Sequence, residues 1–480
     1  MRPLEKESSK KQIRVSAAEL EKQREYAELV KTVLTSRYEP ETPLAFIHTY
    51  GCQGNVADSE RIQGILESLG YGFTDEVEKA DLILYNTCAI REHAEDRIYG
   101  NVGAIKKLKK ENPNLIIALC GCMMQQKRVS DKIIKSYPFV DLIFGTHVVH
   151  RLPEMLYRVL CTGKRVVENS ESDGVIAEDI PVRRDSSFKG WLPIMYGCNN
   201  FCSYCIVPYV RGRERSRRVD DIMKEARELV ASGCKDITLL GQNVNSYGKD
   251  SDEGVNFAKL LRMINDIDGD FIIRFMTSHP KDCTEELLDA MAECDKVAKH
   301  LHLPFQSGND RVLSMMNRRY TREQYLKLAE YARKVMPGLS MTSDVIVGFP
   351  GETYEEFRDT LSLIEEVKFT SLYTFIFSPR PGTKAVELPD PVSREEKGRW
   401  FKELTDTQER IAAERTANMK GKIYRVLCEG YAKDGILNGR TEGNVMIEFP
   451  EKQGENLTGK FCNVKVTEPL TWIVRGELTE

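Results

Sequence analysis

Short apolar runs alternate with amphipathic segments along most of the chain, and this alternation restricts the fold more than any other feature. From Pro43 the runs AFIHTYGC, LILYNTC, LIIALCGC and VDLIFG are separated by helix-like segments such as DSERIQGILESLGY. Strands that alternate with helices pair in parallel and lie between helical layers. Residues 43–160 are therefore predicted to form an α/β domain with a parallel sheet. Residues 1–42 are predicted to be a charged helical extension.

A second alternating series fills residues 186–416. Its predicted strands are LPIMY, DITLLG, FIIRFM, KHLHLPF, SMTSDVIVGF and SLYTFIF. About six β/α units in a row favour a partial or closed (β/α)6 barrel. Residues 161–185 are polar and acidic and are predicted to be a linker. Residues 417–480 alternate in twos between Gly and Asn turns, which predicts a small all-β barrel of the oligonucleotide-binding type.

The composition is typical of a soluble protein from a reducing compartment. Hydrophobic residues make up 41% and charged residues 30% of the 480, and no apolar run approaches the roughly 18–20 residues that cross a bilayer. The N-terminus lacks the apolar core of a signal peptide. We therefore expect a cytoplasmic protein without a membrane partner. Its thirteen cysteines then favour metal or redox chemistry over a disulfide framework.

The segment YGCNNFCSYC places Cys198, Cys202 and Cys205 in a C-x3-C-x2-C array. The array follows the first predicted barrel strand, at the rim where β/α barrels hold their active sites. A structural zinc site needs a fourth ligand, and the nearest candidates, Cys234 and His279, are not at zinc-finger spacing. A thioredoxin-like dithiol leaves the third cysteine unexplained. An iron–sulfur cluster with three thiolates and one non-protein ligand fits the count better.

Three more cysteines, Cys52, Cys88 and Cys122, each follow a predicted strand of the first domain. Because the ends of parallel strands lie along one edge of the sheet, these thiols are predicted to converge. A lone cysteine in a strand is most often a core residue, but three at equivalent positions indicate a second cluster with an open iron. Cys120 is the alternative to Cys122; it lies on the same face of the strand, but only Cys122 lies past the strand end.

The C-x3-C-x2-C segment followed by about six β/α units resembles the radical S-adenosylmethionine (SAM) superfamily. The resemblance implies that SAM fills the fourth iron corner of the cluster, which then cleaves SAM to a 5′-deoxyadenosyl radical. The segments GQN and VIVGFPGE match the places where that superfamily contacts SAM at strand ends. The implied SAM-binding residues are Gly241, Gln242, Asn243, Ser278, Gln306, Ser307 and Asp344.

The segments TYGCQGNVADSE, NTCAIREHAEDR and CGCMMQQ resemble the N-terminal cluster-binding domain of the radical SAM methylthiotransferase family. The terminal barrel resembles the TRAM domain with which that family holds RNA. The resemblance covers the chain from about Pro43 to its end, with one departure at Gly54, where methionine is usual. It implies two 4Fe-4S clusters, SAM, and insertion of a methylthio group at carbon 2 of N6-dimethylallyladenosine beside the tRNA anticodon.

The resemblance suggests a reaction with two SAM-dependent phases. One SAM methylates a sulfur at the cluster of the first domain, and another provides the radical that activates the adenine. The sequence leaves open whether the sulfur comes from the cluster or from an atom on its open iron. Threonylcarbamoyl-modified tRNA and a ribosomal-protein aspartate are alternative substrates, and a non-catalytic iron–sulfur RNA-binding protein is the alternative from another class. A reductant such as flavodoxin or ferredoxin and a sulfur or cluster-repair donor are the expected protein partners.

The arginine-rich stretch RGRERSRR follows the second cysteine array by a few residues. Guanidinium groups match phosphate oxygens, so we predict contacts with the tRNA anticodon stem-loop. A solvated loop is the alternative, and the net charge of −4 gives no global sign of nucleic-acid binding. Lys420 on the terminal barrel adds to the basic surface. The predicted tRNA-binding residues are Arg211, Arg213, Arg215, Arg217, Arg218, Lys422 and Arg425.

Overall fold

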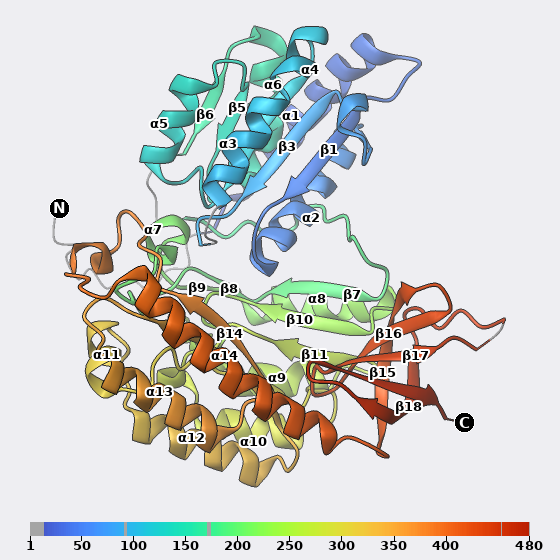
Figure 1. Ribbon diagram of the computed structural model, residues 1–480. Helices are drawn as coiled ribbons and strands as arrows, with labels where there is room; N and C mark the ends of the chain where they lie inside the picture. Colours follow the sequence, from blue (N-terminus) through green and yellow to red (C-terminus); the bar gives the residue numbers. More distant parts are fainter. Residues whose placement is uncertain (1–13, 91–93, 170–173, 453, 480) are drawn as a thin grey trace.

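The computed structural model describes residues 14–90, 94–169, 174–452 and 454–479. These residues form three units: an N-terminal α/β domain, a central β/α unit and a C-terminal β barrel (Figure 1). In the view of Figure 1 the N-terminal domain lies above the central unit, and the C-terminal barrel lies at the right-hand side of that unit. Among the described residues, no helix is both long enough and apolar enough to cross a membrane.

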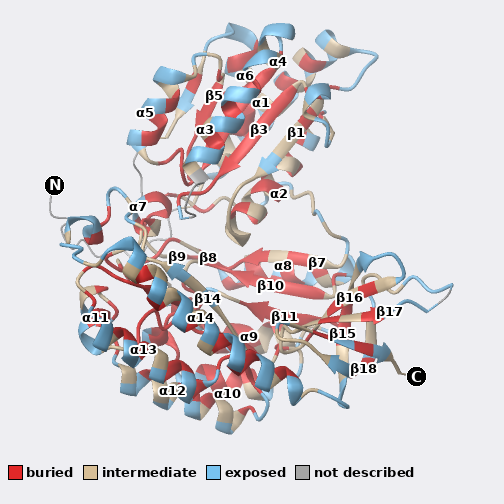
Figure 2. Cartoon of the chain, in the orientation of Figure 1, coloured by how far each residue is buried: buried red, intermediate tan, exposed pale blue. Residues whose placement is uncertain are grey.

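The N-terminal domain is built on a six-stranded parallel sheet. Its strands are β1 (Leu44–Thr49), β2 (Gly72–Phe73), β3 (Leu82–Thr87), β4 (Ile116–Gly121), β5 (Leu142–Phe144) and β6 (Val166–Glu168). They are ordered β2-β1-β3-β4-β5-β6. Every residue of β3 and β4 is buried, as expected for parallel strands covered on both faces (Figure 2). This confirms the predicted parallel-sheet domain.

Two boundaries of this domain differ from the sequence prediction. Strand β6 pairs with β5, so the sheet continues past residue 160 into the predicted linker. The described part of the predicted extension forms α1 (Ala17–Tyr38), whose Val30 and Leu34 are buried in the N-terminal core. Helix α1 is therefore part of the domain's helical layer. The other helices are α2 (Gln53–Ser68), α3 (Ala94–Ala104), α4 (Lys106–Glu111), α5 (Lys127–Ser136) and α6 (Leu152–Thr162), with short turns η1 (Val77–Lys79) and η2 (Val149–Arg151).

The central unit is an open barrel of six parallel strands. These are β7 (Lys189–Pro193), β10 (Asp236–Leu240), β11 (Ile272–Phe275), β12 (His300–His302), β13 (Ser340–Val347) and β14 (Ser371–Ile376). Two three-stranded sheets, β7-β10-β11 and β12-β13-β14, meet where Ile273 pairs with Val297. Within the described residues β7 and β14 do not pair, so the barrel is open there. The predicted partial (β/α)6 barrel is confirmed.

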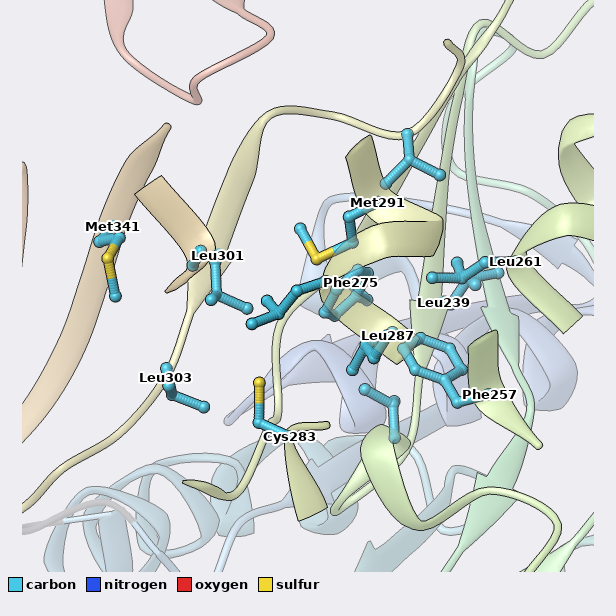
Figure 3. Packing of buried hydrophobic residues seen from close by; sticks show 14 of the residues in the cluster. Leu239, Phe257, Leu261, Phe275, Cys283, Leu287, Met291, Leu301, Leu303 and Met341 are labelled. Atoms are coloured by element: carbon cyan, nitrogen blue, oxygen red, sulfur yellow. The ribbon is translucent and has the colours of Figure 1, made fainter. Parts of the chain in front are cut away.

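Most helices of this unit cover the outside of the barrel, and their apolar faces pack against its strands to form the core. Phe257 and Phe275 meet edge to face with ring centroids 5.0 Å apart, beside Leu239 and Leu287 (Figure 3). The helices are α7 (Val207–Arg211), α8 (Val219–Ala231), α9 (Phe257–Asn265), α10 (Glu285–Glu293), α11 (Asp310–Met315), α12 (Arg322–Val335), α13 (Tyr354–Val367) and α14 (Arg394–Ala417). Short elements complete the unit: β8 (Met195–Tyr196), β9 (Arg215–Ser216), η3 (Val244–Ser246), η4 (Pro280–Asp282) and η5 (Lys384–Glu387).

The C-terminal unit is a closed barrel in the order β15-β16-β17-β19-β18. Its strands are β15 (Ile423–Lys433), β16 (Ile436–Thr441), β17 (Met446–Pro450), β18 (Phe461–Pro469) and β19 (Ile473–Leu478). Arg274 of β11 docks the barrel on the central unit by donating to the main-chain oxygens of Thr441 (3.1 Å) and Glu442 (3.2 Å). This confirms the predicted small all-β barrel.

The described end of the predicted linker, residues 174–185, is a fixed strap rather than a free tether. Arg184 bridges Glu60 of α2, at 2.8 Å, to Glu225 of α8, at 2.7 Å. Helix α2 carries Gly64 where the strap crosses it, because a Cβ at that position would lie 2.3 Å from a strap carbonyl oxygen. These contacts hold the N-terminal domain against the central unit.

Candidate active site

Cys52, Cys88 and Cys122 meet at the carboxyl-end edge of the N-terminal sheet. Each lies within three residues of the end of β1, β3 or β4, and the strand registers bring those ends level. At Gly51 φ is +145°, and a Cβ there would lie 2.8 Å from the Cβ of Cys88, so glycine permits the close approach of the two loops. Burial raises the pKa of the Cys122 thiol to about 12, with Arg211 opposing the shift.

Two buried asparagines, which the sequence analysis did not single out, fix this edge. Asn55 Nδ2 donates to Asn86 Oδ1 and to the Thr87 carbonyl, both at 3.0 Å, and Asn86 Nδ2 donates to the Asn55 carbonyl at 2.8 Å. The Cys52 sulfur lies 3.3 Å from Asn55 Oδ1. Asn55 three residues after Cys52 was the available signal, but an asparagine near a helix start is also an ordinary turn residue.

The surroundings of Cys120 and Cys122 separate the two alternatives. Cys120 is buried in the apolar core of the N-terminal domain. Cys122 instead packs against Ile206 and Val210 of the central unit. Cys122 therefore faces the junction of the two units, which favours it over Cys120 as a ligand.

The second triad, Cys198, Cys202 and Cys205, lies in the loop between β8 and α7 at the barrel rim. The Cys205 amide donates to the Cys202 carbonyl at 3.0 Å, which closes a tight turn. Burial raises the pKa of the Cys198 and Cys205 thiols to about 12. Cys234 precedes β10 at the opposite end of the barrel and belongs to its hydrophobic core, so it does not complete a zinc site here.

Helix α7 joins the two triads. It begins two residues after Cys205 and ends at Arg211, whose Nε donates to Cys122 Sγ at 3.2 Å. A helix of this length spans about 7.5 Å. Figure 1 shows α7 between the N-terminal domain and the barrel. The two triads are therefore neighbours at one junction, although almost 150 residues separate their first cysteines.

The donor chemistry of the triads fits clusters better than single metal ions. Four ligands surround one zinc at about 2.0–2.3 Å, whereas the thiolates of an iron–sulfur cluster bind different iron atoms and stand farther apart. Three thiols at each site are thus suited to a cluster with one iron left for another ligand.

The predicted SAM contacts after β10 differ in whether their side chains already have hydrogen-bond partners within the protein. Gly241 directly follows the strand, and Gln242 Oε1 accepts a bond from the Gly197 amide next to Cys198. Asn243 Nδ2 donates to Asp282 at 2.7 Å. Gln242 therefore holds the cysteine loop against the end of β10.

The remaining predicted contacts lie in the loops after β11 and β12 and within β13. Ser278 donates to the Met276 carbonyl at 3.1 Å, and Ser307 accepts from the Asn309 amide at 3.3 Å. Gln306 has φ +67° and forms a bridge with β13. Asp344 lies 3.5 Å from His302 and is partly exposed. Six of the seven residues therefore follow a barrel strand, whereas Asp344 lies inside β13, three residues before its end.

Three buried side chains at this rim have polar atoms without a partner among the described residues. They are Asn243 Oδ1, the amide group of Asn245, and His279 Nε2. Burial lowers the pKa of His279 to about 2, and its Nδ1 accepts from the Lys281 amide at 3.2 Å. His279 is then neutral with the proton on Nε2, which makes it a donor. An unpartnered buried group costs about 1–3 kcal/mol, so these atoms fit a polar ligand such as SAM. Neither Asn245 nor His279 was among the SAM contacts predicted from the sequence.

The open side of the barrel presents two exposed aromatic side chains. Tyr373 and Phe375 alternate on β14 and are 45% and 54% exposed. Tyr373 pairs in register with Asp344, and its ring lies 5.6 Å from that of His302, edge to face. Because alternate residues of a strand share one face, the two aromatic rings lie on the same face as each other.

The arginine-rich stretch has a different role from the predicted one. Arg211, Arg215 and Arg217 are buried, and Arg217 binds Glu178 at 2.6 Å and Glu225 at 2.7 Å. Arg215 donates to the carbonyls of Arg211 and Arg213. Buried guanidinium groups with internal partners are not open to RNA phosphates, so the prediction is wrong for these three residues. Arg213, over the Phe201 ring at 4.4 Å, and Arg218, near Glu253 at 3.3 Å, are more accessible.

Replacing Arg217 by methionine is expected to destabilise the protein rather than to weaken RNA contacts. The side chain is 3% exposed, and its removal leaves Glu178 without its ion-pair partner, while Glu225 keeps only its ion pair with Arg184 among the described residues. Breaking such a pair costs about 3 kcal/mol or more. A thermal melt should show a lower midpoint, while Arg218→Met should melt like the wild type. An unchanged midpoint for Arg217→Met would contradict the buried-pair assignment.

The predicted RNA contacts on the C-terminal barrel are of two kinds: exposed lysines, and an arginine that already has partners within the protein. Lys420 and Lys422 are exposed in the turn after α14. The Arg425 guanidinium lies 3.5 Å from the Phe461 ring centroid and pairs with Asp270 of the central unit. Arg425 therefore helps to dock the barrel, and the two lysines are the available cations.

Glu352, in the segment VIVGFPGE, organises the turn after β13. Its carboxyl group accepts bonds from the amides of Gly348 (2.7 Å) and Phe349 (3.1 Å), and burial raises its pKa to about 7. Because the pKa of Glu352 is higher in the folded protein than its ordinary value of 4.5, the protonated carboxyl group favours folding. This contribution to the free energy of unfolding is fully present below pH 4.5 and is lost as the pH rises through about 7. Against Glu352→Gln, the wild type should gain up to about 3 kcal/mol between pH ~8 and pH ~4.5. Parallel melting curves across that range would contradict this.

Comparison with known proteins agrees with the geometry. A model of the radical SAM superfamily matches residues 192–364, one of uncharacterized protein family UPF0004 matches residues 45–145, and one of the TRAM domain matches residues 417–479. The tRNA-2-methylthio-N(6)-dimethylallyladenosine synthase of Thermoanaerobacter sp. (strain X514) is 50% identical over 90% of this chain and 92% of its own length. The chain belongs to the radical SAM methylthiotransferase family.

Other relatives extend the match to almost the whole chain. The synthase of the same name from Acetivibrio thermocellus is 48% identical over 98% of both chains. Among solved structures, the radical SAM methyltransferase TsrM from Kitasatospora setae, with tryptophan and a SAM analogue bound, is 14% identical. It covers 82% of this chain and 79% of its own length with a TM-score of 0.52. At that identity the likeness shows the fold alone.

Proposed function

We propose that this protein is a tRNA-2-methylthio-N6-dimethylallyladenosine synthase, a transferase that inserts a methylthio group at carbon 2 of an adenine beside the anticodon. The relatives named above support this activity over at least 90% of the chain. The observation that carries the proposal is the pair of cysteine triads joined by α7. A reaction that uses two clusters on one substrate needs both beside the same space.

The residues present suit two 4Fe-4S clusters and SAM. Cys198, Cys202 and Cys205 would hold the cluster that takes SAM, and the triad of the N-terminal domain would hold the auxiliary cluster. When bound, these groups supply the radical, the methyl group and the sulfur. The chain supplies placement, because α7 sets the spacing of the triads. Asn243, Asn245 and His279 offer buried polar contacts beside the SAM position.

The adenine requires a surface for its ring and exclusion of water, since its C–H bond at carbon 2 offers little to acid–base catalysis. Tyr373 and Phe375 provide exposed aromatic surface on the open side of the barrel. Stacking on an aromatic side chain contributes about 1–3 kcal/mol per base. An adenine of the anticodon loop reaches such a surface when it leaves its own base stack.

The C-terminal barrel is suited to hold the rest of the tRNA. Lys420 and Lys422 lie exposed on it, and phosphate contacts from lysines make binding weaken as salt rises. A flavodoxin- or ferredoxin-type reductant and a sulfur or cluster-repair donor complete the proposed partners, and the cytoplasm is the proposed location. Arg213 and Arg218 are further candidates for RNA contacts beside the site.

An anaerobic assay with SAM, a reductant and dimethylallyl-modified tRNA tests the proposal. Mass spectrometry of the digested tRNA should show the 2-methylthio product, and the reaction mixture should contain 5′-deoxyadenosine. Product from threonylcarbamoyl-modified tRNA or from a ribosomal-protein aspartate instead would assign the protein to another branch of the family. Neither product nor 5′-deoxyadenosine from protein with both clusters loaded would contradict the proposal.

A further inference from the structure

Each cysteine triad has one buried arginine in contact with one of its sulfurs. Arg211 Nε lies 3.2 Å from Cys122 Sγ, and Arg318 Nη1 lies 3.5 Å from Cys202 Sγ. Arg211 is 7% exposed and Arg318 is 6% exposed. A buried guanidinium group costs free energy unless it is paired. Apolar packing alone therefore does not explain an arginine at either position.

The two arginines differ in their other partners. Arg211 Nη2 forms an ion pair with Asp58 of α2 at 2.7 Å. Arg318 donates to the Pro304 carbonyl at 2.7 Å and to Tyr320 Oη at 3.2 Å, and it has no carboxylate partner within the described residues. The charge of Arg211 is thus partly balanced by Asp58, while that of Arg318 is not balanced by a neighbouring carboxylate.

A cation that donates to a cluster thiolate stabilises the more negative, reduced state of the cluster. Hydrogen bonds to the sulfurs and the net charge nearby are two of the factors that set iron–sulfur reduction potentials. Adding one electron to a cluster increases the attraction to the guanidinium, so the cation raises the reduction potential. A carboxylate beside that cation offsets its charge and therefore lowers the reduction potential.

We propose that Arg211 and Arg318 are positioning residues that raise the reduction potentials of the auxiliary cluster and the SAM-binding cluster respectively, and that Asp58 limits the effect of Arg211. This inference rests on the cysteine assignments of the proposed function. It also gives Arg211 a second task, because α7 ties the cation at Cys122 to the loop that ends at Cys205. One short helix therefore sets both the spacing of the triads and the charge at the auxiliary site.

The test is a reductive titration of each cluster, followed by electron paramagnetic resonance. In a background with Cys198, Cys202 and Cys205 replaced by alanine, only the auxiliary cluster contributes to the signal. There Arg211→Met should lower the midpoint potential, Arg211→Lys should restore part of it, and Asp58→Asn should raise it above the parent value. In the matching background without Cys52, Cys88 and Cys122, Arg318→Met should lower the potential of the remaining cluster.

Opposite shifts from Arg211→Met and Asp58→Asn are the decisive result, since a merely structural role would not produce them. Arg218→Met, a change at an exposed arginine of the same segment, should leave both potentials unchanged. If Arg211→Met does not load its cluster, Asp58→Asn and Arg211→Lys still decide the question. Unchanged potentials in loaded variants would overturn the inference and leave the proposed function intact. Parent proteins that lack the expected iron would instead overturn the cysteine assignments.

Discussion

Replacing Cys198, Cys202 and Cys205 together by alanine is expected to lower the iron content from about eight to about four atoms per chain. The same variant should form no 5′-deoxyadenosine and no modified tRNA. The reason is that these thiols lie at the barrel rim, beside the unpartnered atoms of Asn243 and His279, where SAM must meet its cluster. Anaerobic iron analysis and chromatography of the reaction mixture provide the two readouts.

Cys161 offers a matched control for this variant, because it is exposed on α6 and belongs to neither triad. Cys161→Ala should keep the full iron content and the full rate. Zinc in place of iron, or 5′-deoxyadenosine at the wild-type rate from the triple variant, would contradict the assignment of this triad.

Replacing Cys52, Cys88 and Cys122 together by alanine should have a different and more specific effect. About four iron atoms should again remain, but 5′-deoxyadenosine should still form, because the barrel rim is unchanged. The tRNA should acquire no methylthio group, since the proposed site of sulfur transfer has been removed. We therefore expect this variant to lose the methylthio product but to keep forming 5′-deoxyadenosine.

Cys120→Ala is the natural comparison, since it removes a thiol two residues from Cys122 but within the apolar core. It should retain all the iron and form the modified tRNA. If Cys120→Ala loses the auxiliary cluster and Cys122→Ala keeps it, the assignment of the third ligand is wrong.

Alternation of strand and helix was sufficient to predict the two α/β units, and the two-residue period of residues 417–480 predicted the third. Buried parallel strands such as β3 and β4 are continuous apolar runs, so their ends are visible in the sequence. Strand β6 was missed because a three-residue edge strand is too short to show a period. Helix α1 was treated as an extension because its charged surface hides the few buried residues, such as Val30 and Leu34, that attach it.

The arginine-rich stretch shows where sequence reasoning about a site reaches its limit. Local composition cannot distinguish a cation that faces solvent from one whose partner is far away in the sequence. Arg217 pairs with Glu178, and Arg211 pairs with Asp58 from another domain, so both partners became visible only in the fold. For the same reason Asn245 and His279 were recognised as candidate SAM contacts only through their burial and their unpartnered atoms, while the SAM contacts expected from the sequence remain predictions.

The central claim is that both triads serve one adenine in tRNA. The most direct measurement is the anaerobic reaction of the fully loaded protein with SAM, a reductant and dimethylallyl-modified tRNA, followed by nucleoside mass spectrometry. We expect 2-methylthio-N6-dimethylallyladenosine from the wild type and unmodified substrate, together with 5′-deoxyadenosine, from the Cys52/Cys88/Cys122 triple variant. Methylthio product at the wild-type level from that variant, or no product from the loaded wild type, would contradict the claim.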